Sequence, residues 1–314
     1  MAATAHTLGI EGTRLTLDGA PFPLTGVSFF NALYNPSFNQ SAEARRHWLE
    51  VFRSYGINTL RIWCQWDFLA PRAFADVAPE CSMYTDAGEI RPVPLQRLTD
   101  LLRASDDLGM VLEVTLFSHE KEPNLPVDVQ ERGAGALSHH LKPYRNLILQ
   151  IWNEKSDNWR RLFDVVKTAD PERLVTSSPG VSNVLGDDEQ NQALDLLTPH
   201  TIRRSPDAPF WEVAPRQIAD LIRRFNKPVI DDEPARSGPV QFGGIDGGTR
   251  PEWHIEAIKR VREAGGYPIY HHDMVQYGYA APTTPPSGIP EPEFSPFHRK
   301  VFEYLRSTAS APRT

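Results

Sequence analysis

Short apolar runs alternate with amphipathic stretches along almost the whole of this 314-residue chain, and this alternation limits its possible folds more than any other feature. The runs with the length and composition of strands are Phe22–Phe29, Thr59–Trp63, Val111–Phe117, Asn146–Trp152, Leu174–Ser177, Leu194–His200, Pro228–Asp231 and Tyr267–Tyr270. The candidate helices are Ala42–Tyr55, Pro94–Leu108, Val127–Leu141, Asp157–Thr168, Asp187–Gln192, Val213–Phe225, Pro251–Ala264 and Pro296–Arg306. Strands that alternate with helices form parallel βαβ units, and about eight such units predict an α/β fold, the (β/α)8 TIM barrel.

One barrel accounts for the length of the chain. Such barrels use about 250 residues as a single domain, so we expect one domain over residues 1–314, ordered over about 13–306 and frayed at both tails. The structural alternative is a doubly wound sheet, which usually carries a glycine-rich turn after its first strand. Phe29-Phe30-Asn31 stands at that place instead.

The segment before the first barrel strand carries a turn signal. Thr13–Leu17 and Pro21–Leu24 flank the pair Asp18-Gly19. Asp-Gly is a preferred residue pair in two-residue hairpin turns. We therefore expect a short β-hairpin that closes the bottom of the barrel.

Composition excludes several classes of protein. With 40% hydrophobic and 10% aromatic residues, the chain is too apolar for a disordered protein. No run approaches the roughly 18 apolar residues of a membrane-spanning helix, so no membrane partner is expected. The net charge of -7 argues against a nucleic-acid partner. The oligomeric state stays open.

The N-terminus and the cysteines leave the cellular compartment open. Met1–Gly9 has no basic segment followed by an apolar core, so it does not read as a signal peptide. We expect a cytoplasmic protein, or a secreted or periplasmic one whose signal peptide has been removed. Cys64 and Cys81 are either two free thiols or one disulfide, and two cysteines alone do not decide between these.

Charged and aromatic side chains gather near the ends of several candidate strands. Side chains alternate between the two faces of a strand. Leu112, Val114 and Leu116 form an apolar face that should meet the helices, which turns Glu113 inward. The same alternation turns inward Arg61, Trp63, Gln150, Trp152, Glu154, Thr198, His200, Asp231 and Glu233. In (β/α)8 barrels the C-terminal strand ends build the active site, so we expect the site there.

Two acids at these ends have the pattern of a catalytic pair. Glu154 follows the apolar strand that ends at Trp152, and Glu233 follows the strand that ends at Asp231. A retaining glycosidase needs two carboxyl groups about 5–5.5 Å apart, one as nucleophile and one as acid/base. A nearby Arg61 would lower the pKa of the nucleophile. Burial would keep the acid protonated.

The order of motifs resembles that of clan A glycoside hydrolases, and most closely the cellulase-like family 5. Trp152-Asn153-Glu154 is similar to their Asn-Glu signature, and Gly56–Trp63 is similar to their second strand. Leu17–Phe22, leading to Gly26-Val27-Ser28, resembles the start of such domains. The resemblance extends from about Thr13 to Arg306.

This resemblance implies a retaining O-glycoside hydrolase that cleaves a β-linked glycoside or polysaccharide by double displacement. It implies Glu154 as acid/base and Glu233 as nucleophile, with a carbohydrate as the partner and no cofactor or metal. Arg61 matches the arginine that contacts the nucleophile, and Asn153 is placed to bind the sugar 2-hydroxyl.

The remaining candidate substrate contacts come from the strand ends and loops. His119 and His200 match histidines that follow the third and sixth strands of the family. Trp66 and Trp211 fall in expected loops after the second and sixth strands, where exposed aromatic rings would form sugar platforms. The family usually has a Trp at the eighth strand. Here Tyr270 and His272 stand in that region, and we take them as sugar contacts.

Other functions remain open from the sequence. One alternative is a metal-dependent barrel hydrolase that uses His119, His200, His271 and Asp273. Adjacent residues such as His271 and His272 point to opposite faces of a strand and make a poor chelate. Another alternative is a barrel that transfers glycosyl groups, or one that binds sugar without cleaving it.

Overall fold

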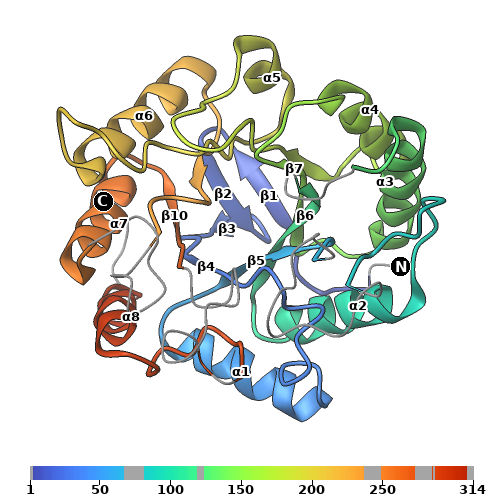
Figure 1. Ribbon diagram of the computed structural model, residues 1–314, viewed down its shortest axis with the longest axis horizontal. Helices are drawn as coiled ribbons and strands as arrows, with labels where there is room; N and C mark the ends of the chain where they lie inside the picture. The colour runs from blue at the N-terminus through green and yellow to red at the C-terminus, as the bar shows by residue number, and fades with distance from the viewer. Residues whose placement is uncertain are drawn as a thin grey trace.

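In the computed structural model, helices surround a ring of parallel strands (Figure 1). The structure describes residues 3–66, 81–118, 124–236, 249–272, 285 and 287–309. The parallel strands are β4 (Gly26–Ser28), β5 (Thr59–Trp63), β6 (Val111–Ser118), β7 (Leu147–Asn153), β8 (Leu174–Thr176), β9 (Ile230–Asp231) and β10 (Tyr267–Tyr270). The helices are α1 (Ala42–Ser54), α2 (Pro92–Asp106), α3 (Val127–Leu141), α4 (Trp159–Ala169), α5 (Asp188–Ala193), α6 (Phe210–Phe225), α7 (Pro251–Glu263) and α8 (Pro296–Thr308). The alternation read from the sequence is confirmed.

The parallel strands form one sheet in the order β8-β7-β6-β5-β4-β10-β9. The expected strand Leu194–His200 is not a regular strand, but its backbone joins the two edges of this sheet. Asp195 N donates to Val175 O of β8 at 3.1 Å, and Leu197 N donates to Pro228 O beside β9 at 2.9 Å. The ring therefore closes as a barrel, and the doubly wound alternative is excluded.

An antiparallel sheet of β1 (Leu8–Glu11), β2 (Arg14–Leu17) and β3 (Ala20–Pro21) precedes the barrel. Asp18 and Gly19 have φ angles of 54° and 78°, as a tight hairpin turn requires. The expected hairpin is confirmed, with β1 as an additional strand. Its apolar side chains share one buried cluster with the barrel strands, and that cluster includes Leu8, Leu15, Phe22, Leu24, Val111, Ile148, Tyr267 and Ile269. The small sheet thus covers the N-terminal end of the barrel (Figure 1).

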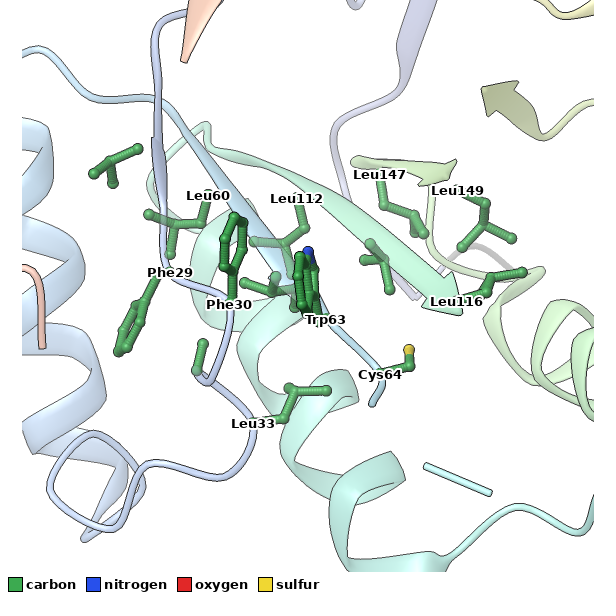
Figure 2. Packing of buried hydrophobic residues seen from close by; sticks show 14 of the residues in the cluster. Phe29, Phe30, Leu33, Leu60, Trp63, Cys64, Leu112, Leu116, Leu147 and Leu149 are labelled. Atoms are coloured by element: carbon green, nitrogen blue, oxygen red, sulfur yellow. The ribbon is translucent and has the colours of Figure 1, made fainter. Parts of the chain in front are cut away.

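The larger core lies between the strands and the helices. Leu60, Leu112 and Leu149 from three neighbouring strands are fully buried in one cluster (Figure 2). Leu98 and Leu101 of α2 belong to the same cluster, so the apolar face of the strands meets the helices, as the alternation predicted. Burying a side chain of this size stabilises the fold by about 1.5–3 kcal/mol.

Residues at the start of α1 and the two cysteines also have well-defined environments. Ser41 Oγ accepts from Ala44 N at 3.1 Å and caps the start of α1. Cys64 and Cys81 are both buried and form no disulfide. Burial raises the pKa of Cys64 to about 12, so its thiolate is scarce at neutral pH. Within the described ranges no helix is both long and apolar enough to cross a membrane.

Candidate active site

The barrel brings the two predicted carboxylates together. Glu154 directly follows β7, and Glu233 lies two residues beyond β9. One ligand atom from each of Glu154, His200 and Glu233 lies within 4.8 Å of the other two. All three residues are buried. The cluster sits at the C-terminal ends of the strands, where active sites of such barrels are found.

The backbone at Glu154 departs from strand geometry. Its φ is 61°, in the left-handed region that costs a residue other than glycine about 1–2 kcal/mol. Neighbouring residues of a regular strand point to opposite faces. The left-handed turn after β7 lets both Asn153 and Glu154 reach the same site.

The Arg61 side chain links three residues of the site by hydrogen bonds. Its guanidinium donates from Nη1 to Glu233 Oε2 at 2.6 Å, and from Nη2 to Asn153 Oδ1 at 2.7 Å and to Gln150 Oε1 at 2.8 Å. The side chain of Arg61 is completely buried and packs over the ring of Phe30, with the guanidinium carbon 5.1 Å from the ring centre. Arg61 therefore fixes Glu233 and Asn153 relative to each other.

Glu233 is held in its ionised form. Burial raises the pKa of its carboxyl group, but neighbouring histidines and arginines lower it more, so the net pKa lies well below the usual range. The groups that lower it are His200, His271, Arg203 and Arg61. An ionised carboxylate with low pKa is suited to attack an electrophilic carbon, and unsuited to donate a proton.

His200 lies between the acids. Its Nδ1 is 3.0 Å from Glu154 Oε1 and 3.0 Å from Val181 O, so the proton resides on Nδ1 and is donated to these acceptors. Its Nε2 is 3.7 Å from Asp232 Oδ1 and 3.8 Å from Glu233 Oε2. Burial lowers the pKa of His200, but Glu233 and the other carboxylates raise it to a net value above the usual one.

A second pair of acids lies beneath the site. Asp232 Oδ2 accepts from Gln150 Nε2 at 2.6 Å and is 3.1 Å from Arg61 Nε. Glu113 Oε1 accepts from Gln150 Nε2 at 3.0 Å. Burial, reinforced by the charge of Asp232, raises the pKa of Glu113 well above its usual range. Glu113 is therefore a neutral acid in the barrel interior, on the face that the sequence assigned to it.

The expected alternation is wrong at the end of β9. It placed Asp231 on the same face as Glu233, with Asp232 opposite. In the structure Asp231 accepts from Thr201 Oγ1 at 2.9 Å and lies beside α7, and burial raises its pKa to about 7. The interior position belongs to Asp232. The strand ends at Asp231, so its alternation does not continue to the next two residues.

The prediction that Tyr270 and His272, in and after β10, face the site is also wrong. The Tyr270 ring packs against His254 of α7 and Phe302 of α8, and His272 packs against His298 of α8. Both therefore lie in the layer between barrel and helices.

His271 takes the position facing the site. Its Nε2 is 3.8 Å from Glu233 Oε1, and its Nδ1 is 3.0 Å from Ser28 Oγ. Burial lowers the pKa of His271 well below its usual value. The signal for this face was present in the sequence, since Ile269 belongs to the N-terminal end of the barrel core and shares its parity with His271.

The predicted aromatic platforms are not exposed loop residues. Trp66 is 2% exposed and packs edge-on against Trp63, with ring centres 6.0 Å apart. Trp211 lies in the first turn of α6, because that helix begins at Phe210 rather than at Val213. It stacks on Trp253 of α7 at 4.8 Å. His119 and Asp273 lie outside the described residues.

Arg203 is the site residue that the sequence reasoning missed. Its Nη2 donates to Glu154 Oε1 and to Glu233 Oε1, each at 2.9 Å. The residue is 9% exposed. It follows His200 by three positions, beyond the end of the expected strand, and an arginine in a loop normally indicates a solvated side chain. No motif or spacing in the sequence marks it.

The cluster of Glu154, His200 and Glu233 also has the composition of a metal site. Arg203 argues against a cation there, because its guanidinium already donates to both carboxylates, and Arg61 adds a second positive charge at Glu233. A divalent ion would have to share the carboxylates with two arginines.

A separate cavity lies at the opposite end of the barrel. It has a volume of about 810 Å³ and is lined by β3, by the loops before β4 and after α1, and by the ends of α7 and α8. Phe22, Arg262 and Tyr304 are among its walls, and none of the predicted site residues is.

Comparison with known proteins identifies the fold. No protein-family model matches the chain, and no curated protein matches its sequence. Solved structures do match. A family 5 glycoside hydrolase from Bacteroides vulgatus has a TM-score of 0.67 at 15% identity over 89% of this chain and 65% of its own. A family 5 mannosidase from Rhizomucor miehei has a TM-score of 0.61 at 13% identity over 97% of this chain and 99% of its own.

An endo-1,4-β-mannanase from Eisenia fetida matches equally well, with a TM-score of 0.61 at 12% identity over 96% of this chain and 95% of its own. The chain spans about two thirds or less of the two Bacteroides vulgatus chains it resembles, 65% of one and 60% of the other. At these identities the likeness concerns the fold. The chain therefore has the (β/α)8 barrel fold of these solved glycoside hydrolases.

Proposed function

We propose that this protein is a retaining O-glycoside hydrolase with a single catalytic domain, acting on a β-linked glycoside or polysaccharide. The observation that carries the proposal is the approach of Glu154 and Glu233 to within 4.8 Å at the C-terminal strand ends. Retaining enzymes have carboxyl groups about 5–5.5 Å apart, whereas inverting enzymes keep them about 6.5–9.5 Å apart to admit a water molecule. The names of the structural neighbours, which are glycosidases, support the same reaction class.

The first step assigns a different role to each carboxylate. Glu233, held ionised by Arg61 and its other positive neighbours, attacks the anomeric carbon. Glu154 donates its proton to the glycosidic oxygen as the bond from that oxygen to the anomeric carbon breaks. The sugar becomes an ester of Glu233, the leaving group departs as an alcohol, and Glu154 becomes a carboxylate.

The second step reverses these roles. Glu154, now a base, takes a proton from water while the water oxygen attacks the anomeric carbon and the ester bond to Glu233 breaks. The sugar leaves with its original anomeric configuration. The residues perform this without a metal or an organic cofactor.

Asn153 provides a donor for the sugar. Its Oδ1 accepts from Arg61, and its Nδ2 is buried with no hydrogen-bond partner among the described residues. An unsatisfied buried donor costs about 1–3 kcal/mol. A hydroxyl at the sugar 2-position would satisfy it, and that contact strengthens in the transition state.

Glycosyl transfer remains the second candidate, since an alcohol in place of water would intercept the same ester. An added acceptor alcohol distinguishes the two. Glycosylated alcohol as the dominant product at low acceptor concentration indicates a transferase. Free sugar as the dominant product indicates a hydrolase.

The test is a panel of nitrophenyl glycosides and polysaccharides, with β-mannosides included because two neighbours are named for mannose substrates. We expect turnover of at least one β-glycoside, unaffected by a chelator. Glu154→Gln and Glu233→Gln should each lower kcat at least about 10³-fold. Glu172→Gln is the matched control, because the Glu172 side chain is 85% exposed. Near-wild-type turnover by either site variant would overturn the assignment, and loss of activity with chelator would indicate a metal enzyme.

A further inference from the structure

Arg203 stands between the two carboxylates that the proposed reaction uses. One nitrogen, Nη2, is 2.9 Å from Glu154 Oε1 and 2.9 Å from Glu233 Oε1. Arg203 Nε also donates to the backbone oxygen of Glu233 at 3.3 Å. The guanidinium therefore has one contact with Glu154 and two with Glu233.

This placement conflicts with a bound substrate. The anomeric carbon must lie next to Glu233 and the glycosidic oxygen next to Glu154, so the bond to be cleaved occupies the space between them. Arg203 Nη2 is within hydrogen-bond distance of both carboxylates and occupies part of that space. Glu154 Oε1 already accepts from His200 Nδ1 as well as from Arg203 Nη2, so a glycosidic oxygen that approaches Glu154 competes with the guanidinium for this carboxylate.

We propose that Arg203 is a positioning residue: it ties Glu154 to Glu233 in the free protein, then leaves Glu154 and stays on Glu233 when a glycosidic bond enters. This inference rests on the proposed function and deepens it. The asymmetry of the contacts supports the direction of the movement, because the two contacts with Glu233 survive when the one with Glu154 is lost. Departure of the guanidinium also removes a donor that competes with the glycosidic oxygen for Glu154, while the contact with His200 Nδ1 remains.

The charged groups around Glu233 determine how a substitution of Arg203 should change the pKa of Glu233. The positive or titratable groups that face it are Arg61 of β5, His200 and Arg203 of the chain between β8 and α6, and His271 after β10. The acids that face it are Glu154 after β7, Glu113 of β6 and the neighbouring Asp232. Arg203 is one of the positive charges that lower the pKa of Glu233. A neighbouring opposite charge lowers a carboxyl pKa by about 1–3 units.

The first measurement needs no substrate. The Glu233 carboxyl is titrated by 13C NMR in protein labelled at glutamate, with its signal assigned from Glu233→Gln. Arg203→Gln should raise the Glu233 pKa by about one unit or more, and Arg203→Lys should restore most of the shift. Arg204→Gln, at the exposed neighbouring position, should leave it unchanged. An unchanged Glu233 titration in Arg203→Gln overturns the inference whether or not any glycoside is turned over.

The second measurement uses the best substrate from the panel. Arg203→Gln should lower kcat about 10- to 100-fold without raising KM, because Glu233 loses a donor while the substrate no longer displaces a guanidinium. A raised KM with unchanged kcat would make Arg203 a simple substrate contact and contradict the proposal.

A structure of the wild-type protein with a sugar bound covers the case in which Arg203→Gln fails to fold. Arg203 should lie beyond hydrogen-bond distance of Glu154 and remain on Glu233. Retention of both contacts beside the bound sugar would overturn the inference. Failure of the proposed function is distinguishable, since it appears as absence of turnover with the expected Glu233 titration intact.

Discussion

Arg61 and Glu233 form a fully buried ion pair, in which Arg61 Nη1 lies 2.6 Å from Glu233 Oε2. Both charges are removed from water, which is expensive unless each keeps its partners. Arg61 satisfies that requirement by also donating to Gln150 and Asn153. The stability of the barrel therefore depends on the same ion pair that keeps the candidate nucleophile Glu233 ionised.

Arg61→Met should be strongly destabilising. It leaves Glu233 buried with fewer positive partners, and breaking a buried pair from one side costs about 3–5 kcal/mol of unfolding free energy. Arg61→Lys should cost less but still impair activity, because one ammonium cannot reproduce the planar donor fork of arginine. Urea unfolding of the three proteins at neutral pH measures this. An unfolding free energy for Arg61→Met within about 1 kcal/mol of wild type would show that the pair contributes no net stability.

Glu113→Gln should change the unfolding free energy little, in contrast to substitutions of the charged residues near Glu113. Burial and the charge of Asp232 raise the pKa of Glu113 and keep it protonated, so an amide of the same shape replaces a neutral acid. We expect a cost below about 1 kcal/mol, against about 2–4 kcal/mol for Glu113→Ala, which leaves a void and removes one of the acceptors of Gln150 Nε2.

The pH dependence adds a signed test for Glu113. An acid with a raised folded pKa binds its proton more tightly when folded, so it makes stability fall as pH rises above the unfolded value of 4.5. Glu113→Gln should remove this term, and its stability relative to wild type should improve between pH 5 and pH 8. A constant difference over that range would show that Glu113 is not a neutral acid.

Three buried histidines between β10, α7 and α8 should make the fold sensitive to acid. Burial lowers the pKa of His254 and of His272 to about 3, and that of His298 well below its usual value. In the unfolded chain these histidines take up protons near pH 6.5, whereas in the folded protein His254 and His272 do so only near pH 3. Stability is therefore full above pH 6.5 and falls as pH drops through the window from 6.5 to 3, by up to about 1.4 kcal/mol per unit for each histidine.

His254→Phe tests this acid sensitivity. Phenylalanine fits the ring contacts with Phe210, Phe297 and Tyr270, and it removes one proton-binding group. The slope of unfolding free energy against pH, measured by urea unfolding between pH 4.5 and 7.5, should become shallower. His139→Gln, on an exposed position of α3, is the matched control and should leave the slope unchanged. Equal slopes in His254→Phe and wild type would contradict the account.

Asn153→Asp tests the roles of the two polar atoms of the Asn153 side chain separately. The aspartate keeps an oxygen that accepts from Arg61 Nη2 and loses the buried donor Nδ2. We expect kcat/KM to fall by about 10²-fold or more, since a polar contact made in the transition state is lost. Asn153→Ala should lose a similar factor. Retention of activity by Asn153→Asp would show that Nδ2 does not bind the sugar.

The sequence was sufficient for the parts governed by periodicity. The strand-helix alternation predicted the barrel, and the side-chain alternation placed Arg61 and Glu113 in its interior. Both rest on regular backbone, where position along the strand determines direction.

Alternation failed where the backbone stops being regular. Asp232 rather than Asp231 points inward because β9 ends first, and Asn153 joins Glu154 because of the left-handed backbone after β7. Arg203 could not be predicted, since its contacts depend on how the segment after His200 returns across the barrel mouth. At β10, the parity that His271 shares with Ile269 indicated that His271 faces the site. The prediction that Tyr270 and His272 face it was therefore wrong for a strand whose alternation is regular.

In the proposed mechanism Glu233 forms a covalent bond to the sugar, with Glu154 as its acid/base partner. A 2-deoxy-2-fluoro glycoside of the sugar preferred in the panel slows the second step and traps the ester. Mass spectrometry of the digested protein locates the label. We predict one fluoroglycosyl group on the peptide that carries Glu233, and none in Glu233→Gln. A label on Glu154, or turnover with inverted anomeric configuration and no trapped ester, would contradict the account.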